Sequence, residues 1–201
     1  ALGNDSKNTN PSGYCRMLSV LDLFRIGLGP SSSHTVGPMR IARRFLQEAA
    51  KSGKLAGAIR IEIVLQGSLA LTGVGHGTDK AVILGLIGMQ PETADPAEAE
   101  AAFRRTVQGK EIRLMDGPSV AFNAVRDIVF DTKSVPDLHP NGMVLCLFSG
   151  DAEPDFSRTY FSTGGGFIAS RRQLEKPVRK DLVDSARGAP HPFNSAREML
   201  D

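Results

Sequence analysis

A cluster of hydroxyl and imidazole side chains lies near the start of the chain, between two Gly/Pro pairs. Residues 31–35, the serine loop, have the sequence Ser-Ser-Ser-His-Thr and directly precede a segment with the pattern of an amphipathic helix. Serine, threonine and histidine side chains donate hydrogen bonds, and the free N–H groups at a helix start add partial positive charge. The loop therefore suits an anion such as a carboxylate. A helix N-cap with additional serines explains the same residues equally well.

Three of the four histidines lie beside glycine-rich or proline-rich turns. They are His34 in the serine loop, His76 in Gly-His-Gly-Thr-Asp and His139 in His-Pro-Asn-Gly. Imidazole is the side chain best suited to proton transfer near neutral pH, and flanking glycines let a substrate approach closely. A single loop histidine is usually a surface residue, but three in such settings favour a functional role. The chain has no G-x-S-x-G elbow and no complete phosphate-binding glycine motif, which argues against a nucleophilic serine and a P-loop.

Hydrophobic spacing places these residues among helices and strands in the first half of the chain. Apolar residues at helical spacing predict a helix from Pro38 to about Gly53, and alternation predicts a half-buried strand over residues 59–66. A glycine-rich loop over residues 67–77 should lead into a helix capped by Thr78. The Ala/Glu/Arg-rich residues 97–107 predict a further helix. Each histidine-bearing turn in this half therefore precedes a helix.

The second half of the chain consists of short strand-like runs. They cover residues 112–115, 119–125, 128–131, 143–148 and 158–162, with turn signals at residues 116–118, 141–142 and 164–166. Early helices and late strands predict an α+β fold with a mixed or antiparallel sheet covered by helices. The triple glycine at 164–166 is typical of a β-bulge, or of a close approach to a neighbouring loop.

Composition limits the classes of function. The chain has 201 residues with 24 Lys plus Arg against 22 Asp plus Glu, and this balance gives no general field for nucleic acid. No apolar run is long enough for a membrane span, so no membrane partner is expected and the cytoplasm is the default location. Neither Cys15 nor Cys146 has a cysteine or histidine at ligand spacing, so we expect no metal ligands in this chain.

Five blocks of the sequence resemble, in order, blocks of the bacterial iron–sulfur L-serine dehydratases (L-serine ammonia-lyases). They are residues 19–39, 67–80, 139–143, 160–167 and 192–195. The resemblance implies that residues 17–170 are the family's N-terminal β domain and that residues 171–201 are a linker towards its iron–sulfur α domain, which is absent here. Residues 1–16 are polar and aperiodic, which predicts a disordered leader or a non-native extension. We expect such a fragment to be inactive alone.

The resemblance also implies a reaction and site roles. L-serine would be converted to pyruvate and ammonia with a [4Fe-4S] cluster held by the α domain, without pyridoxal phosphate. Matching the motifs assigns binding of the substrate carboxylate, and the lining of the cluster pocket, to Ser31, Ser32, Ser33, His34 and Thr35. His76 is the first choice for the base that removes the α-proton, His139 is the second, and Asn141 is a polar substrate contact. The motifs do not separate the two candidate bases.

A competing hypothesis comes from the fold. The family's β domain is similar to the allosteric substrate-binding domain of some phosphoglycerate dehydrogenases. The chain could therefore be a non-catalytic module that binds serine or another small anion as an effector. A homodimer is expected with either function.

Overall fold

A five-stranded mixed sheet forms one layer of the fold. The computed structural model describes residues 27–150, 153–176 and 197. The strands of the sheet are β1 (Arg60–Gly67), β4 (Ile128–Asp131), β5 (Asn141–Phe148), β6 (Phe156–Gly164) and β7 (Phe167–Ser170). Their order is β4-β1-β5-β6-β7, with β1 and β4 parallel and the other neighbours antiparallel. The predicted α+β class with a mixed sheet is confirmed.

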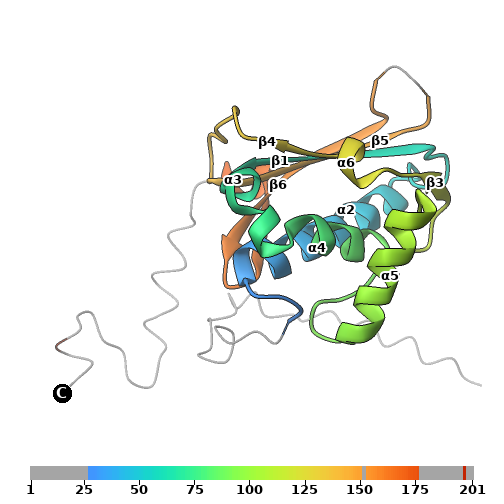
Figure 1. Ribbon diagram of the computed structural model, residues 1–201. Helices are drawn as coiled ribbons and strands as arrows, with labels where there is room; N and C mark the ends of the chain where they lie inside the picture. Colours follow the sequence, from blue (N-terminus) through green and yellow to red (C-terminus); the bar gives the residue numbers. More distant parts are fainter. Residues whose placement is uncertain (1–26, 151–152, 177–196, 198–201) are drawn as a thin grey trace, which may run out of the picture. The chain divides into compact units, whose positions relative to one another are not determined.

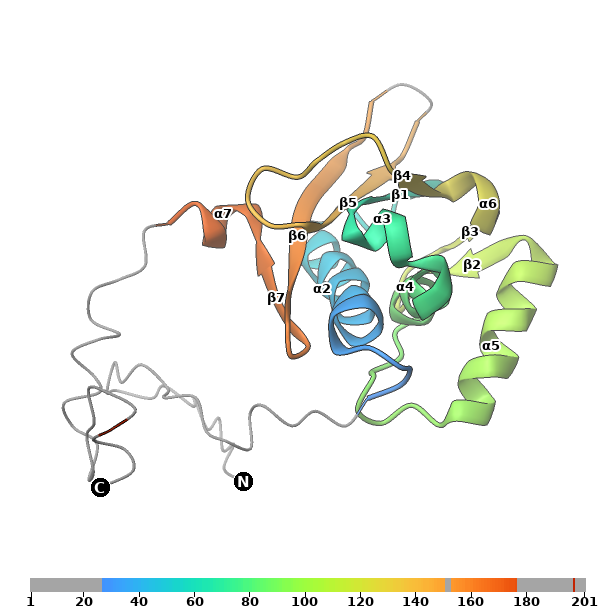
Figure 2. The same ribbon diagram turned by 60° about the vertical axis from the view of Figure 1, so that its left-hand side comes forward.

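Helices cover one face of this sheet (Figures 1 and 2). The longer ones are α2 (Gly37–Lys51), α4 (Thr78–Leu86) and α5 (Pro96–Gly109). The short ones are α3 (Ser68–Thr72), α6 (Ala124–Asp127) and α7 (Arg171–Leu174), with a π-helical turn η1 (Ser32–Val36) and a 3-10 turn η2 (Val74–His76). Strands β2 (Glu111–Arg113) and β3 (Ser119–Ala121) form a separate hairpin.

The core lies between α2, α4 and the sheet. Helix α2 buries Phe45 and Leu46 fully on one face, and its arginines occupy the opposite face. Strand β1 alternates as predicted, with Ile61, Ile63 and Leu65 completely buried. Burying aliphatic and aromatic side chains of this size contributes about 1.5–3 kcal/mol each, which holds the helix and sheet layers together.

Three local predictions need correction. Residues 67–77 are not an open loop, because they form α3 and η2. The strand predicted over residues 119–125 ends at Ala121, since the side chain of Asn123 accepts the N–H groups of Val125 and Arg126 and starts α6. The predicted turn at residues 141–142 is the first part of β5, where Asn141 pairs with Gly67 of β1.

The triple glycine joins β6 to β7. Gly164, Gly165 and Gly166 all have positive φ angles, and the register of the two strands shifts between Ser162 and Gly164. The carbonyl of Gly166 also accepts a hydrogen bond from Arg40 of α2. The bulge interpretation is therefore supported, and the contact of this turn is with a side chain of a helix and not with a neighbouring loop.

Several predictions fall outside the described residues. They are the leader over residues 1–16, the first part of the block at residues 19–39 and most of the linker over 171–201. Within the predicted linker, α7 is described and contacts β6 and β7. Among the described residues, no helix is both long enough and apolar enough to cross a membrane.

Candidate active site

The serine loop folds into the turn η1, which continues directly into α2. The side-chain Oγ of Ser31 accepts the N–H of His34 at 3.1 Å, and its carbonyl accepts the N–H of Thr35. Ser31 therefore caps the turn, as one of the two sequence interpretations predicts. Ser32 is exposed and Ser33 is half-buried, so further hydroxyls of the loop remain near the surface.

His34 is held at both ring nitrogens. Its Nδ1 lies 2.9 Å from the Oγ of Ser33, and its Nε2 lies 3.0 Å from the Oγ of Ser68 at the start of α3. Burial, and then the charge of the neighbouring His76, lower the pKa of His34 below its ordinary value of 6.5, against a smaller opposing effect of Ser68. The ring is therefore neutral at neutral pH, and serine hydroxyls contact both of its nitrogens.

His76 stacks against His34 and has a different set of contacts. The ring centroids lie 4.8 Å apart with 33° between the planes. The Nδ1 of His76 lies 2.9 Å from the carbonyl oxygen of Thr72. Because a carbonyl only accepts, Nδ1 carries the hydrogen and the neutral ring has its lone pair on Nε2. That arrangement is the one required of a general base.

Two buried threonine hydroxyls join the histidine-bearing segments. Thr35 Oγ1 donates to the carbonyl of His76 at 3.1 Å, and Thr78 Oγ1 donates to the carbonyl of His34 at 2.6 Å. Thr35 is 4% exposed and Thr78 is fully buried. Thr78 is not the N-cap of α4 as predicted, because Gly77 occupies that position and the threonine hydroxyl bonds His34 instead. These reciprocal bonds fix the backbone of one histidine relative to the other, although 42 positions separate them in sequence.

His139 reaches the same region through the start of β5. The N–H of Asn141 points to the Nδ1 of His139 at 3.2 Å, so this nitrogen is an acceptor and Nε2 carries the hydrogen. The side-chain Nδ2 of Asn141 donates to the carbonyl of Ser162 at 3.0 Å, and Ser162 Oγ donates to the carbonyl of Ser33 at 2.7 Å. This chain of bonds connects Asn141 to the serine loop.

A tight crossing at Gly67 also joins the His139 segment to α3. Gly67 has a φ of 57°, and a Cβ there would lie 2.2 Å from the carbonyl oxygen of Pro140. The next residue, Ser68, donates its N–H to that same carbonyl at 2.8 Å. Glycine is required for this approach, which brings the neighbour of His139 next to the residue that contacts His34.

A hollow of about 390 Å³ lies beside His76. Its polar side chains are Thr35, His76 and Lys80, and the Lys80 ammonium pairs with Glu100. The rest of its lining is Leu28, Gly29, Pro30, Gly75, Gly77, Ala81, Leu84 and Pro96. Of the predicted site residues, only Thr35 and His76 line this hollow. Hydrogen bonds connect the side chains of Ser31, Ser33, His34, His139 and Asn141 to neighbouring residues, and Ser32 is exposed.

Comparison with known proteins identifies the family. The family model described as serine dehydratase beta chain matches residues 19–173. The chain belongs to the serine dehydratase beta chain family. The first four motif blocks that predicted this family lie within the matched residues, and the block at residues 192–195 lies beyond them.

Curated relatives of this β-chain domain are longer proteins. "L-serine dehydratase 1" of Escherichia coli (strain K12) is 37% identical over 185 residues, which cover 92% of this chain and 39% of the relative. "L-serine dehydratase" of Helicobacter pylori (strain ATCC 700392 / 26695) is 36% identical over 91% of this chain and 39% of its own length. "L-serine dehydratase" of Mycobacterium bovis is 38% identical over 92% of this chain and 39% of its own length. The chain thus spans about two fifths of the relatives it matches.

Three contacts of the β-chain site were not predicted from sequence. Ser68 binds His34, Thr78 binds the carbonyl of His34, and Ser162 binds the carbonyl of Ser33. All three residues lie inside blocks that resemble the family. The resemblance therefore covered these three residues. Hydroxyl side chains are common in turns, however, and no spacing rule distinguishes a serine or threonine that makes such a contact from one that does not.

The described part of the β-chain domain does not supply an iron–sulfur site. Cluster irons are held mainly by cysteine thiolates. The described cysteine is Cys146 on β5, and its thiol lies 3.3 Å from the hydroxyl of Ser157 on the neighbouring strand. No group of three or more histidine, cysteine or acidic side chains suited to a metal ion occurs within the ranges described. These residues do not fit the role of cluster ligands.

Proposed function

We propose that this chain is the β domain of an L-serine dehydratase and contributes proton transfer and substrate binding to the conversion of L-serine to pyruvate and ammonia. Family membership, the curated relatives and the three interconnected histidine segments support this proposal. Assembly as a homodimer and a cytoplasmic location are further proposals.

His76 is the proposed base. Its Nδ1–H is directed to the carbonyl of Thr72 at 2.9 Å, and this single contact carries the assignment because it leaves Nε2 free to accept a proton. His34 stacks on it as a neutral ring, so the imidazolium that forms on His76 meets no second positive charge. The glycines on either side of His76 leave room for the substrate.

His139 is the proposed hydrogen-bond donor. In the neutral ring, Nδ1 accepts the N–H of Asn141 and Nε2–H is available for a substrate oxygen. The side chain of Asn141 is fixed by its bond to Ser162, which leaves its Oδ1 to accept from the substrate ammonium. Ser32, Ser33 and the neighbouring serine-loop residues are proposed to hold the carboxylate.

These roles account for part of a balanced reaction. Removal of the α-proton and loss of the β-hydroxyl as water give aminoacrylate, and addition of water to its imine tautomer gives pyruvate and ammonia. The family resemblance assigns activation of the hydroxyl to a [4Fe-4S] cluster. Because the described residues offer no ligands for it, we assign this chain only the binding and proton-handling roles.

Single-residue variants of the complete dehydratase polypeptide test the assignment. Replacement His76→Ala should lower kcat by about 10²–10⁴-fold, the usual contribution of a general base, with the cluster absorption spectrum unchanged. Replacement His139→Ala should mainly raise KM, since it removes a substrate hydrogen bond. Wild-type turnover in His76→Ala would contradict the role of His76 as the base. Loss of α-proton exchange in His139→Ala but not in His76→Ala would assign the base to His139 instead.

The isolated 201-residue chain provides a second test. We propose that it does not deaminate serine, because the activation of the leaving hydroxyl is assigned elsewhere. Pyruvate formation can be followed with lactate dehydrogenase and NADH. Turnover by the isolated chain without added iron would contradict the assignment of hydroxyl activation to a cluster.

A further inference from the structure

A second and larger hollow lies at a corner of the sheet. Its volume is about 680 Å³, and it shares no lining residue with the hollow beside His76. It forms because β7 pairs with β6 only from Tyr160 onward and then turns into α7. The earlier part of β6, residues 156–159, is left as an edge, and the second half of α2 and α7 close the hollow beside residues 157–159.

Two arginines, one on α2 and one on β6, place positive charge in the lining of the hollow. Arg44 of α2 donates through Nε to Glu48 at 2.7 Å and through Nη1 to Gln173 at 3.0 Å. Arg158 of β6 lies 3.8 Å from the same carboxylate and 4.2 Å above the ring of Phe156. Since a guanidinium has five N–H groups, these contacts fix both side chains and leave donors for a ligand.

The rim adds one ion-paired cation and two unpaired ones. Arg171 forms a two-point ion pair with Asp137, at 2.8 and 2.9 Å. Arg172 and Lys176 have no hydrogen-bond or ion-pair partner within the described part of the chain. The lining as a whole carries five cationic side chains, Arg44, Arg158, Arg171, Arg172 and Lys176, against the two carboxylates of Glu48 and Glu175.

We infer that this hollow binds a small organic anion that carries two or more phosphate or carboxylate groups. Its volume lies in the range typical of small-molecule sites, and guanidinium groups bind phosphate and carboxylate through paired hydrogen bonds. The free edge of β6 is only four residues long, which is shorter than most paired strands and does not favour an added peptide strand. This inference goes beyond the proposed catalysis and does not depend on it.

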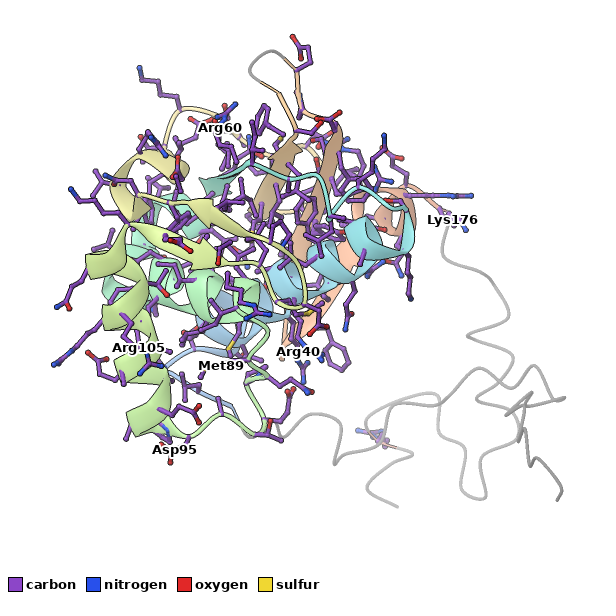
Figure 3. The ribbon with its side chains drawn as sticks, turned by 90° about the vertical axis from the view of Figure 1, so that its right-hand side faces the viewer. Arg40, Arg60, Met89, Asp95, Arg105 and Lys176 are labelled. Carbon is purple, nitrogen blue, oxygen red and sulfur yellow. The ribbon has the colours of Figure 1, made fainter. Side chains whose placement is uncertain are left out.

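Titration calorimetry of the 201-residue chain with pyrophosphate and with citrate tests the inference. The double variant Arg172→Ala/Lys176→Ala removes two exposed, unpaired cations and should bind either probe at least about tenfold more weakly, the usual effect of a lost charged hydrogen bond. The matched control is Arg105→Ala/Lys110→Ala, which removes the same charge from exposed residues of the α5 end. Lys176 and Arg105 lie on opposite sides of the view in Figure 3.

The expected pattern is binding that weakens with added salt, persists in the control and is lost in the rim variant. A dissociation constant weaker than about 1 mM for both probes at low ionic strength would overturn the inference. Equal weakening in the rim variant and the control would also overturn it, since general charge and not this hollow would then attract the anion. Capture of an acidic peptide with no binding of either probe would replace the small-molecule site with a polypeptide site.

Discussion

The hydroxyl of Thr78 should stabilise both the fold and the geometry of the histidine pair. It is fully buried and donates to the carbonyl of His34 at 2.6 Å. His34 lies in the π-helical turn η1, and the α-helical donor to its carbonyl, the N–H of residue 38, is missing because Pro38 has none. The threonine hydroxyl supplies a side-chain donor to this carbonyl. Replacement Thr78→Val keeps the shape of the side chain and removes only this donor.

The expected loss of unfolding free energy in Thr78→Val comes from removing the hydroxyl donor to the buried carbonyl of His34. Such a loss costs about 1–3 kcal/mol, a large part of the roughly 5–15 kcal/mol that stabilises a typical domain. For a chain of this size, 1 kcal/mol lowers the melting temperature by about 2–4 °C. Urea unfolding followed by circular dichroism should show a lower midpoint with an unchanged m-value.

A matched threonine elsewhere provides the control. Thr106 of α5 is also buried, but its hydroxyl donates to the carbonyl of Ala102 one helical turn earlier, inside a regular helix. Replacement Thr106→Val leaves that carbonyl with its backbone partner and should cost about 0.5 kcal/mol or less. Equal losses for Thr78→Val and Thr106→Val, or no loss for Thr78→Val, would refute the reasoning.

Two further predictions concern other contacts. In the complete enzyme, Ser68→Ala should lower kcat about tenfold, because the ring of His34 loses its contact at Nε2. The control Ser68→Thr keeps the hydroxyl and should retain the wild-type kcat. Similar kinetics in both variants would exclude this positioning role. Burial opposes ionisation of Glu48, but hydrogen bonds from Arg44 and Tyr160 and the nearby arginine charges outweigh it and lower its pKa from 4.5. The contribution of ionised Glu48 to stability should therefore be present above pH 4.5 and be lost as the pH falls through its folded-state pKa. The unfolding free energy of Glu48→Gln should then change less over this acid range than that of the wild type.

Much of the fold was predictable because its signals are local. The alternation of Ile61, Ile63 and Leu65 and the apolar face of α2 are set by burial on one side of an element, which sequence periodicity records directly. The mixed sheet followed from the order of helical and strand-like segments. The errors lie where a side chain competes with the backbone. Asn123 ends a predicted strand by capping α6, and Asn141 pairs in β5 where its type favours a turn.

The candidate site was predictable as a set of residues but not as a geometry. The blocks that resemble the family contain His34, His76 and His139, and the structure brings the first two together and links the third through Asn141, Ser162 and the serine loop. Which hydroxyl binds which carbonyl depends on crossings between segments far apart in sequence. No local pattern records such contacts.

The same limit explains why sequence could not separate the two candidate bases. His76 and His139 both lie beside turn residues, and an imidazole of either can donate or accept a proton. Their neighbours distinguish them: His76 faces a carbonyl that only accepts, whereas His139 faces an N–H that only donates. The two neutral rings must therefore present opposite groups at Nε2, a lone pair on His76 and a hydrogen on His139. An α-proton has to be removed by a lone pair, so the proposed division between base and donor follows from two backbone atoms and not from the histidines themselves.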